Sequence, residues 1–450
     1  MSETDLTKGS ILEHMKRIAI PSSIGLLFNT LYNVVDTYYA GMLSTDALAG
    51  LTLSFPIFFI IIALSSGIGS GTTALSSIAL GENSLDDFHK LAYNALLSGI
   101  LISLFLGVIG FILTPFLFTV TGASGPSMAL GISYTQTIFF GAGFFILSFI
   151  LNGILNAQGD TKSYRNFLIF GFFMNLILDP LFIFGWFGIP KMGVIGIAFA
   201  TVVVQLIGTV YLTYRVIKSP LFNYKAFMSE HLSSTTIISL FKQGMPASLN
   251  MATIAIGVFV INYFILYFDN ATTIAAFGAA VRVEQLALLP ALGLNVATLT
   301  IAGQNFGAKK ITRIYEVLSK SIWIGVAIMV TGAVIIFIFA PYAISIFNDD
   351  PLVISSGTTY LRIEALALPT YVILNAIISV LQGIKKPNFA VYIGLYRQIL
   401  MPFILFHLLG TYFGLGIYGV WWGIVIINWT AVAIAFFFFR RIASKAIPLA

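Results

Sequence analysis

The stretch Asn29-Thr30-Leu31-Tyr32-Asn33-Val34-Val35-Asp36 places a carboxylate inside the first long apolar segment of the chain, residues 16–41. An aspartate at the centre of a membrane helix costs about 2.5 to 3.5 kcal/mol, and such an acid usually marks an ion pathway or a proton relay. At helical spacing Asn29 and Asp36 fall on one face, and Tyr32 or Asn33 lies between them. The two asparagines alone would equally suit packing against neighbouring helices. Asp36 is therefore the first functional candidate.

The composition excludes a water-soluble fold. Of the 450 residues, 58% are hydrophobic and 9% are charged, and the mean hydropathy is +0.97, whereas about 25% of the residues of a soluble domain are charged. The chain has no cysteine, and its four histidines show neither metal-ligand spacing nor a nucleophile constellation. We expect a membrane protein that is not an enzyme, holds no metal or organic cofactor and binds no nucleic acid.

Twelve apolar segments are long enough to span a bilayer, which takes about 20 residues in a helix. A polar connection, residues 218–236, separates the first six from the last six. We therefore expect an all-α polytopic protein with an N-terminal lobe (1–217), a cytoplasmic linker (218–236) and a C-terminal lobe (237–450). Prolines inside the spans are expected to kink them. The predicted spans are residues 16–41, 47–80, 90–120, 128–157, 163–187, 191–217, 237–268, 271–306, 312–340, 352–382, 388–413 and 415–440.

The positive charges predict the orientation. Of the 23 lysines and arginines, Arg282, Arg362 and Arg397 lie within spans, and only Lys191 lies in a loop assigned to the outer side. The others lie in the termini and in the loops of the opposite side. Because cytoplasmic loops carry the excess of Lys and Arg, both termini are predicted to be cytoplasmic.

The two halves of the chain resemble each other at an offset of roughly 222 to 226 residues, as in transporters built from internal repeats. Pro21-Ser22-Ser23 matches Pro246-Ala247-Ser248, and Gln158-Gly159 matches Gln382-Gly383. Each half has six spans, so both halves begin on the same side of the membrane. We therefore expect two six-helix lobes related by a pseudo-two-fold axis along the membrane normal, with a cavity between them.

The fifth span carries a second acid. Asn175 and Asp179 stand one helical turn apart, and Pro180 leaves the carbonyl of Leu176 without its helical donor. A carboxyl, an amide and a free carbonyl suit either a proton with ordered water or Na⁺. Alternatively, the polar groups only cap a kink. In the repeat Asp179 matches Met401, and Asp36 likewise has no acidic counterpart, so we expect the coupling chemistry to reside in the first lobe alone.

The second lobe has intramembrane charges of its own. Arg282 and Glu284 lie in the eighth span, two residues apart, and therefore point to different faces of the helix. Glu364 lies in the tenth span near Arg362. Three interpretations remain open at this stage: pairing across helices, a cavity lining for cationic substrates, or a second ion site.

These segments resemble multidrug and toxic compound extrusion (MATE) transporters of the DinF-like prokaryotic subfamily along essentially all twelve spans. The resemblance implies a V-shaped molecule of two six-helix lobes around a central cavity, which exports amphipathic, often cationic compounds in exchange for H⁺ or Na⁺. It also implies that Asp36 is the protonation site. The most specific motifs are residues 31–36, 152–155, 158–160, 175–180 and 193–201. Met401 argues against the NorM-like branch, whose acids lie in the second lobe. Glu284, which is an acid in the second lobe, does not argue against that branch.

The resemblance also implies roles for individual residues. Side chains that match hydrogen-bonding partners of the acid are Tyr134, Asn175, Asp179 and Thr201, and those that match the lining of the N-lobe cavity are Asn29, Tyr32 and Asn152, to which the polar stripe adds Asn33. Glu284 and Arg282 are the candidates in the second lobe.

The expected mechanism is antiport by alternating access in the inner membrane of a prokaryote, by a monomer. A proton from outside neutralises Asp36, the first helix bends near Pro21, with Pro180 as a second break, and the cavity narrows to expel the drug. We expect H⁺ rather than Na⁺, although Asp36, Asn175, Asp179 and Thr201 would also suit Na⁺. The alternatives are a lipid-linked precursor flippase of the same superfamily and, in another class, a channel or receptor.

Overall fold

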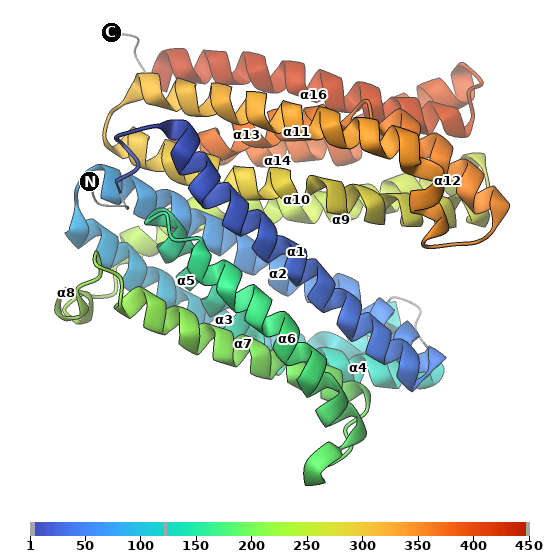
Figure 1. Ribbon diagram of the computed structural model, residues 1–450, viewed down its shortest axis with the longest axis horizontal. Helices are drawn as coiled ribbons and strands as arrows, with labels where there is room; N and C mark the ends of the chain where they lie inside the picture. The colour runs from blue at the N-terminus through green and yellow to red at the C-terminus, as the bar shows by residue number, and fades with distance from the viewer. Residues whose placement is uncertain (1–4, 121–123, 447–450) are drawn as a thin grey trace. The chain divides into compact units, whose positions relative to one another are not determined.

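The computed structural model describes residues 5–120 and 124–446 (Figure 1). Its regular elements are helices, and no strand occurs within these ranges. Ten helices are long and apolar enough to cross a membrane, and two bent pairs of shorter helices bring the candidate spans to twelve. The prediction of an all-α polytopic protein is therefore confirmed.

The first six spans agree with the prediction to within a few residues. The fourth span consists of two helices, α4 and α5, which meet at an angle of 48°. The short helix α8 lies in the segment predicted to be a linker. The elements are α1 (Ile11–Leu43), α2 (Thr45–Gly81), α3 (Leu85–Val120), α4 (Gly125–Phe140), α5 (Ala142–Ala157), α6 (Lys162–Phe184), the 3₁₀ turn η1 (Trp186–Gly188), α7 (Val194–Ile217) and α8 (Tyr224–Met228).

The last six spans follow the same plan. Helices α12 and α13 form the tenth span and meet at 50°, and two π-helical turns interrupt the eleventh span. The elements are α9 (Ser234–Phe268), α10 (Ala271–Gly307), α11 (Ile311–Ser345), α12 (Pro351–Glu364), α13 (Leu368–Gly383), α14 (Phe389–Leu395), η2 (Tyr396–Leu400), α15 (Met401–His407), η3 (Leu408–Tyr412) and α16 (Ile417–Ala446).

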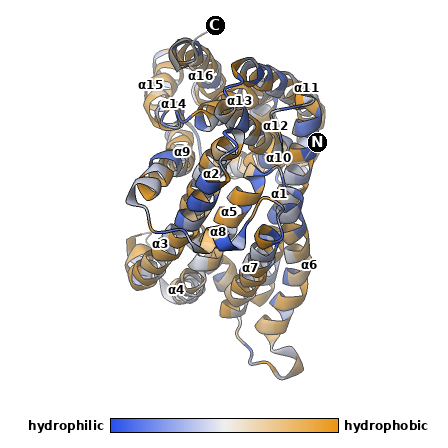
Figure 2. Ribbon diagram, turned by 90° about the vertical axis from the view of Figure 1, so that its left-hand side faces the viewer, coloured by the Kyte–Doolittle hydropathy of each residue, from blue (hydrophilic) through white to orange (hydrophobic). Residues whose placement is uncertain are grey.

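The helices expose large apolar side chains, as expected for contact with lipid. On α3, for example, Leu104, Phe105 and Ile112 are exposed over 62%, 67% and 67% of their surface. Figure 2 shows apolar residues along the length of most helices. In water such a surface would aggregate, and in a bilayer it faces acyl chains.

A backbone motif repeats at the ends of four helices. Asn83, Gly159, Lys309 and Lys385 each adopt positive φ, between 57° and 78°, just after α2, α5, α10 and α13. In each case the next amide donates to a carbonyl five residues back, for example Ser84 to Ala79 and Lys310 to Asn305, which closes the helix end in a Schellman-type cap. Because the third and fourth caps lie 226 residues after the first two, the backbone itself carries the predicted internal repeat.

The chain divides into two compact units that differ from the predicted lobes at two helices. Of the described residues, unit 1 comprises Asp5, 24–120 and 124–248, and unit 2 comprises 6–23 and 249–446. The first part of α1 therefore packs with unit 2, and the first part of α9 packs with unit 1. Each division falls two residues after a proline, Pro21 in α1 and Pro246 in α9.

Hydrogen bonds hold the segment that precedes α1 in unit 2. The amide of Leu6 donates to Oε1 of Gln304 at 2.9 Å, and Nδ2 of Asn305 donates to the carbonyl of Leu6 at 3.2 Å. The side chain of Leu6 is fully buried. In unit 1 the segment that precedes α9 is held in the same manner, because the amide of Ser233 donates to Oδ1 of Asn94 at 2.8 Å.

Candidate functional site

Four helices of unit 1 supply the candidate coupling residues. Helix α1 carries Asp36, and α6 carries Asn175 and Asp179 one turn apart, so the two α6 side chains share a face. Thr201 lies on α7 and Tyr134 on α4. All five side chains are buried, with at most 6% of their surface exposed. The fold therefore places residues that are far apart in the sequence in one interior region.

One amide group links the two acids. Nδ2 of Asn175 donates to Oδ1 of Asp36 at 2.6 Å and to Oδ2 of Asp179 at 3.0 Å. Thr201 Oγ1 donates to the other oxygen of Asp36 at 3.3 Å. Two ionised carboxylates on one donor repel each other strongly in a buried region, so a proton or a cation shared between them would relieve the repulsion.

Tyrosines flank these acids. Tyr134 lies within electrostatic reach of Asp36 and Asp179, although its hydroxyl makes no hydrogen bond to either within the described chain. Tyr32, on α1 one turn before Asp36, is 9% exposed. Tyr32 is therefore buried with the acids, and its place in the cavity lining stays a prediction.

Several polar atoms of this region have no hydrogen-bond partner among the described residues. They are Oδ1 of Asn175, Oδ1 of Asp179 and the hydroxyl of Tyr32. A buried polar atom left without a partner costs about 1–3 kcal/mol. Oxygens of carboxylate, amide and hydroxyl groups are the ligands of hard cations, and they also accept from a protonated acid or from water. The residues present therefore fit either a proton or Na⁺.

The carbonyl predicted to be free beside Pro180 is occupied. The hydroxyl of Tyr39, from α1, donates to the carbonyl of Leu176 at 3.4 Å. The prediction that this carbonyl has no donor was therefore wrong, because α1 supplies a donor that a single-helix argument does not include. As a result, Asp36 and Tyr39 attach α1 to α6 at two points.

The predicted cavity residues separate into two environments. Asn29 and Asn33 are exposed, and Nδ2 of Asn33 donates to the carbonyl of Asn29 within α1 at 3.0 Å. Asn152 on α5 is half-buried, and its Oδ1 has no partner among the described residues. The polar stripe proposed for α1 is thus split, with the two asparagines exposed and Tyr32 and Asp36 buried.

The two candidate bending prolines lie inside continuous helices. Helix α1 continues through Pro21, and α6 continues through Pro180. Both rings are buried. Pro21 stands next to the point where α1 passes from unit 2 to unit 1, whereas Pro180 lies within unit 1.

A second buried polar cluster lies in unit 2. The hydroxyl of Tyr371 donates to Oε1 of Glu364 at 2.8 Å, and the guanidinium of Arg397 stacks on the ring of Tyr371, 5.2 Å from its centroid. Nε of Arg397 donates to Oδ1 of Asn428 at 2.9 Å. Glu284 lies within electrostatic reach of Glu364. Sequence spacing did not predict this set, which brings five separate elements together.

Arg282, the other candidate in the second lobe, lies apart from this cluster. Its guanidinium faces the ring of Phe347, 5.8 Å from the centroid. Oε1 of Glu284 and Oε2 of Glu364 have no hydrogen-bond partner among the described residues. The signal that could have found the cluster is Arg397 itself, an intramembrane cation that stands at the repeat position of Asn175 and falls in the π-helical turn η2, a feature often found at functional sites.

Comparison with known proteins identifies similar chains. The family model MatE matches residues 21–181 and again residues 246–406, so the second match begins 225 residues after the first. This agrees with the internal repeat. The probable multidrug resistance protein YoeA of Bacillus subtilis is 29% identical over 76% of this chain and 75% of its own length. An FAD transporter of Shewanella oneidensis is 26% identical over 87% of this chain and 86% of its own length.

Solved structures show the same fold. A MOP superfamily transporter from Pyrococcus furiosus matches with a TM-score of 0.93 and 25% identity, over 100% of this chain and 99% of that chain. Structures of MATE in a bent and in a straight conformation each match with a TM-score of 0.92 and 25% identity, over 99% of this chain and 98% and 99% of those chains.

Proposed function

Because the chain belongs to the MatE family, we propose that it is a cation-coupled exporter that drives amphipathic organic compounds out of the cell in exchange for H⁺. The family makes the chain a membrane transporter and not an enzyme. The coupling ion, the substrate class and the part played by the first helix are the proposal. The observation that carries it is the amide of Asn175, which bridges Asp36 on α1 and Asp179 on α6.

A proton arriving at this bridge would change how α1 is held. Ionised Asp36 accepts from Asn175 and Thr201, and hydrogen bonds to a charged acceptor are about twice as strong as neutral ones. Neutralisation weakens both, so the hold of α6 and α7 on α1 loosens. Pro21 has no amide hydrogen to donate to the helical hydrogen-bond pattern, so α1 can bend at this residue. Similar proteins solved in a bent and in a straight conformation support two states of this kind.

The orientation of the Asn175 amide determines what the binding of each ion would require. Its nitrogen, and not its oxygen, faces both acids, and a nitrogen that donates cannot ligate a cation. Binding of Na⁺ would require the amide to turn its oxygen toward the ion. Binding of a proton requires no such rotation.

The energy available from one proton is sufficient for export. A membrane potential of about 100 mV supplies about 2.3 kcal/mol per charge, and one pH unit supplies about 1.36 kcal/mol. Together they sustain a gradient of several hundred-fold for a neutral substrate exchanged one for one. Exchange of a monovalent cation for one proton is electroneutral and loses the voltage contribution.

The relatives leave two substrate chemistries to compare. One relative is named a probable multidrug resistance protein, and another is named an FAD transporter. We propose amphipathic compounds because the apolar composition of the chain suits them. A lipid-linked precursor flippase would need a more basic site for a polyanionic head group, and Arg282 and Arg397 are both already stacked on aromatic rings.

The test is efflux from proteoliposomes, with a pH gradient and a Na⁺ gradient imposed separately and a cationic dye or FAD as cargo. We expect dye efflux driven by the pH gradient and abolished by an uncoupler. Asp36→Asn should abolish coupled efflux and leave a folded protein in detergent, and Asp46→Asn, at the exposed start of α2, is the matched control. Driven efflux at the wild-type rate by Asp36→Asn would refute Asp36 as the protonation site. Efflux driven by the Na⁺ gradient alone would identify Na⁺, and not H⁺, as the coupling ion. Downhill flux alone would indicate a channel.

A further inference from the structure

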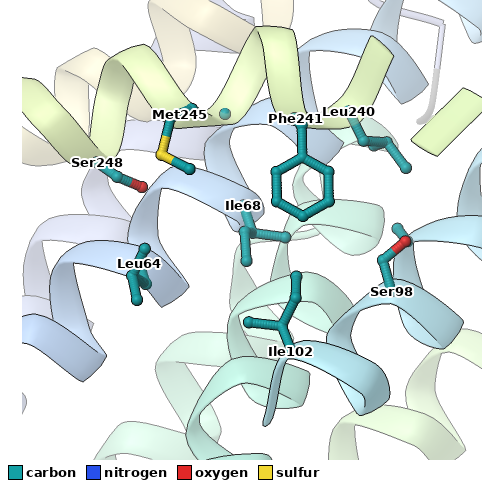
Figure 3. Close-up of a pocket in the computed structure, with 10 residues that line it drawn as sticks. Leu64, Ile68, Ser98, Ile102, Leu240, Phe241, Met245 and Ser248 are labelled. Atoms are coloured by element: carbon teal, nitrogen blue, oxygen red, sulfur yellow. The ribbon is translucent and has the colours of Figure 1, made fainter. Parts of the chain in front are cut away.

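A small apolar pocket in unit 1 has no part in the coupling chemistry. It lies between α2, α3 and the first part of α9 and has a volume of about 40 Å³ (Figure 3). The side chains that define it are Leu64 and Ile68 of α2, Ile102 of α3, and Leu240, Phe241 and Met245 of α9. Phe241 and Met245 are exposed over 37% and 39% of their surface, so the pocket is bordered by side chains at the surface of the unit.

The lining of the pocket does not suit water. One water molecule needs about 10–15 Å³ of such space, so the pocket has room for water. However, the hydroxyl of Ser98 donates to the carbonyl of Asn94 in its own helix at 2.5 Å, and the other side chains of the lining, Ser248 apart, are apolar. Apolar cavities stay dry and bind apolar groups. The occupant is therefore apolar where it enters the pocket.

Two lysines that do not line the pocket, but stand close in sequence to its lining residues on α3 and α9, indicate the charge at the other end of the occupant. Lys242 is the single charged residue of α9, is exposed, and directly follows Phe241. Lys90 lies on the face of α3 that leads to Ser98, two turns nearer the start of the helix. Neither ammonium has a hydrogen-bond or ion-pair partner in the part of the chain that the structure describes. Asp86 and Asp87 lie further out, in the first turn of α3.

This arrangement of charge selects the head group. Both lysines lie toward the helix ends that the charge rule assigns to the cytoplasm. Lysine stems extend along apolar surface to bring the ammonium to the level of the head groups. The two lysines would repel a cationic compound, whereas they would attract the head group of an anionic phospholipid. The charges therefore favour a lipid over a cationic substrate.

We propose that this pocket binds one acyl chain of an anionic phospholipid of the cytoplasmic leaflet, with its phosphate on Lys242. The inference does not depend on the coupling mechanism. The α9 part of the pocket ends at Ser248, the last residue of unit 1 in this helix. A bound acyl chain fills the space between α9 and α2–α3 and so stabilises the first part of α9 in unit 1.

The experiment measures lipid selectivity at the pocket itself. The full chain carrying Phe241→Trp is placed in phosphatidylcholine nanodiscs and titrated with phosphatidylglycerol or phosphatidylcholine brominated in the acyl chain, and quenching is read as the difference from wild type. One lysine near a membrane surface is worth about 1 kcal/mol, so we expect an about fivefold preference for phosphatidylglycerol. Lys242→Gln should reduce this preference toward one, and Lys242→Arg should retain it.

A control on the same helix separates a site from general lipid contact. Phe259→Trp lies on the part of α9 that belongs to unit 2, at a position that is 65% exposed, and should show no preference between the two lipids. Equal preference at both tryptophans, or an unchanged preference in Lys242→Gln, would overturn the proposal. Displacement of the quencher by a cationic dye with no preference between lipids would identify a substrate site instead.

Discussion

At the scale of single residues, Tyr39 links two helices through a carbonyl that proline leaves open. Its hydroxyl donates to Leu176 at 3.4 Å, and hydrogen bonds between membrane helices contribute about 0.6 kcal/mol on average. Tyr39→Phe should therefore lower the free energy of unfolding by about 0.5–1 kcal/mol, measured as a shift in thermal unfolding in detergent. Tyr38→Phe is the matched control because Tyr38 is 63% exposed and makes no hydrogen bond within the described chain. Equal melting temperatures for the two variants would contradict this role.

The sequence predicted the acids but not all of their partners. Asp36, Asn175 and Asp179 stand out because polar groups are expensive inside an apolar segment, and the i, i+4 spacing on α6 places two of them together. Tyr39 and Tyr371 carry no such signal. A tyrosine is common in membrane helices, and its partner depends on how two helices are rotated about their axes, which a single sequence does not encode.

At the scale of helices, Gly141 lies at the break in the fourth span, between α4 and α5. A Cβ at this position would lie 2.4 Å from a methyl group of Val202 on α7, so only glycine allows α7 to approach the bend between α4 and α5. Gly141→Ala should lower the free energy of unfolding by about 1–3 kcal/mol through overpacking. The control Gly143→Ala meets only the side chain of Ser103, at 3.3 Å, and should be milder.

A second substitution tests the cause of that loss. In Gly141→Ala/Val202→Ala the clash is removed, so the double variant should unfold at a higher temperature than the sum of the two single effects predicts. Simple additivity would show that the clash with Val202 is not the cause of the loss. The measurement is thermal unfolding of the four proteins under one detergent condition.

Bends were harder to predict than spans. The twelve apolar segments emerge from length and hydropathy, because the bilayer sets both. The sequence assigned kinks to prolines, and the tenth span does bend beside Pro369. However, the fourth span bends at Gly141, where no proline stands, and α1 and α6 continue through their prolines. A bend at glycine depends on which neighbour approaches it, and this is a tertiary property.

At the scale of the whole molecule, each unit contains part of a helix that belongs to the other half of the sequence. The fragment 24–248 contains the helical part of unit 1. The fragment 1–225 has the same length, but it lacks the first part of α9 and contains a stretch of α1 that packs with unit 2. We expect the fragment 24–248 to give a monodisperse, cooperatively melting protein in detergent more readily than 1–225. The opposite ranking would show that the sequence halves, and not the compact units, are the folding units.

The attachment of Leu6 to Gln304 also determines when the molecule can be completed during synthesis. The two residues are separated by 298 positions, and ribosomes add about 5–20 residues per second. The amino-terminal segment therefore emerges about 15 to 60 s before its partner exists. During this interval the buried leucine and the first turns of α1 have nothing to pack against in unit 2. Completion of unit 2 is consequently a late, long-range event of biogenesis, whose timing is set by translation.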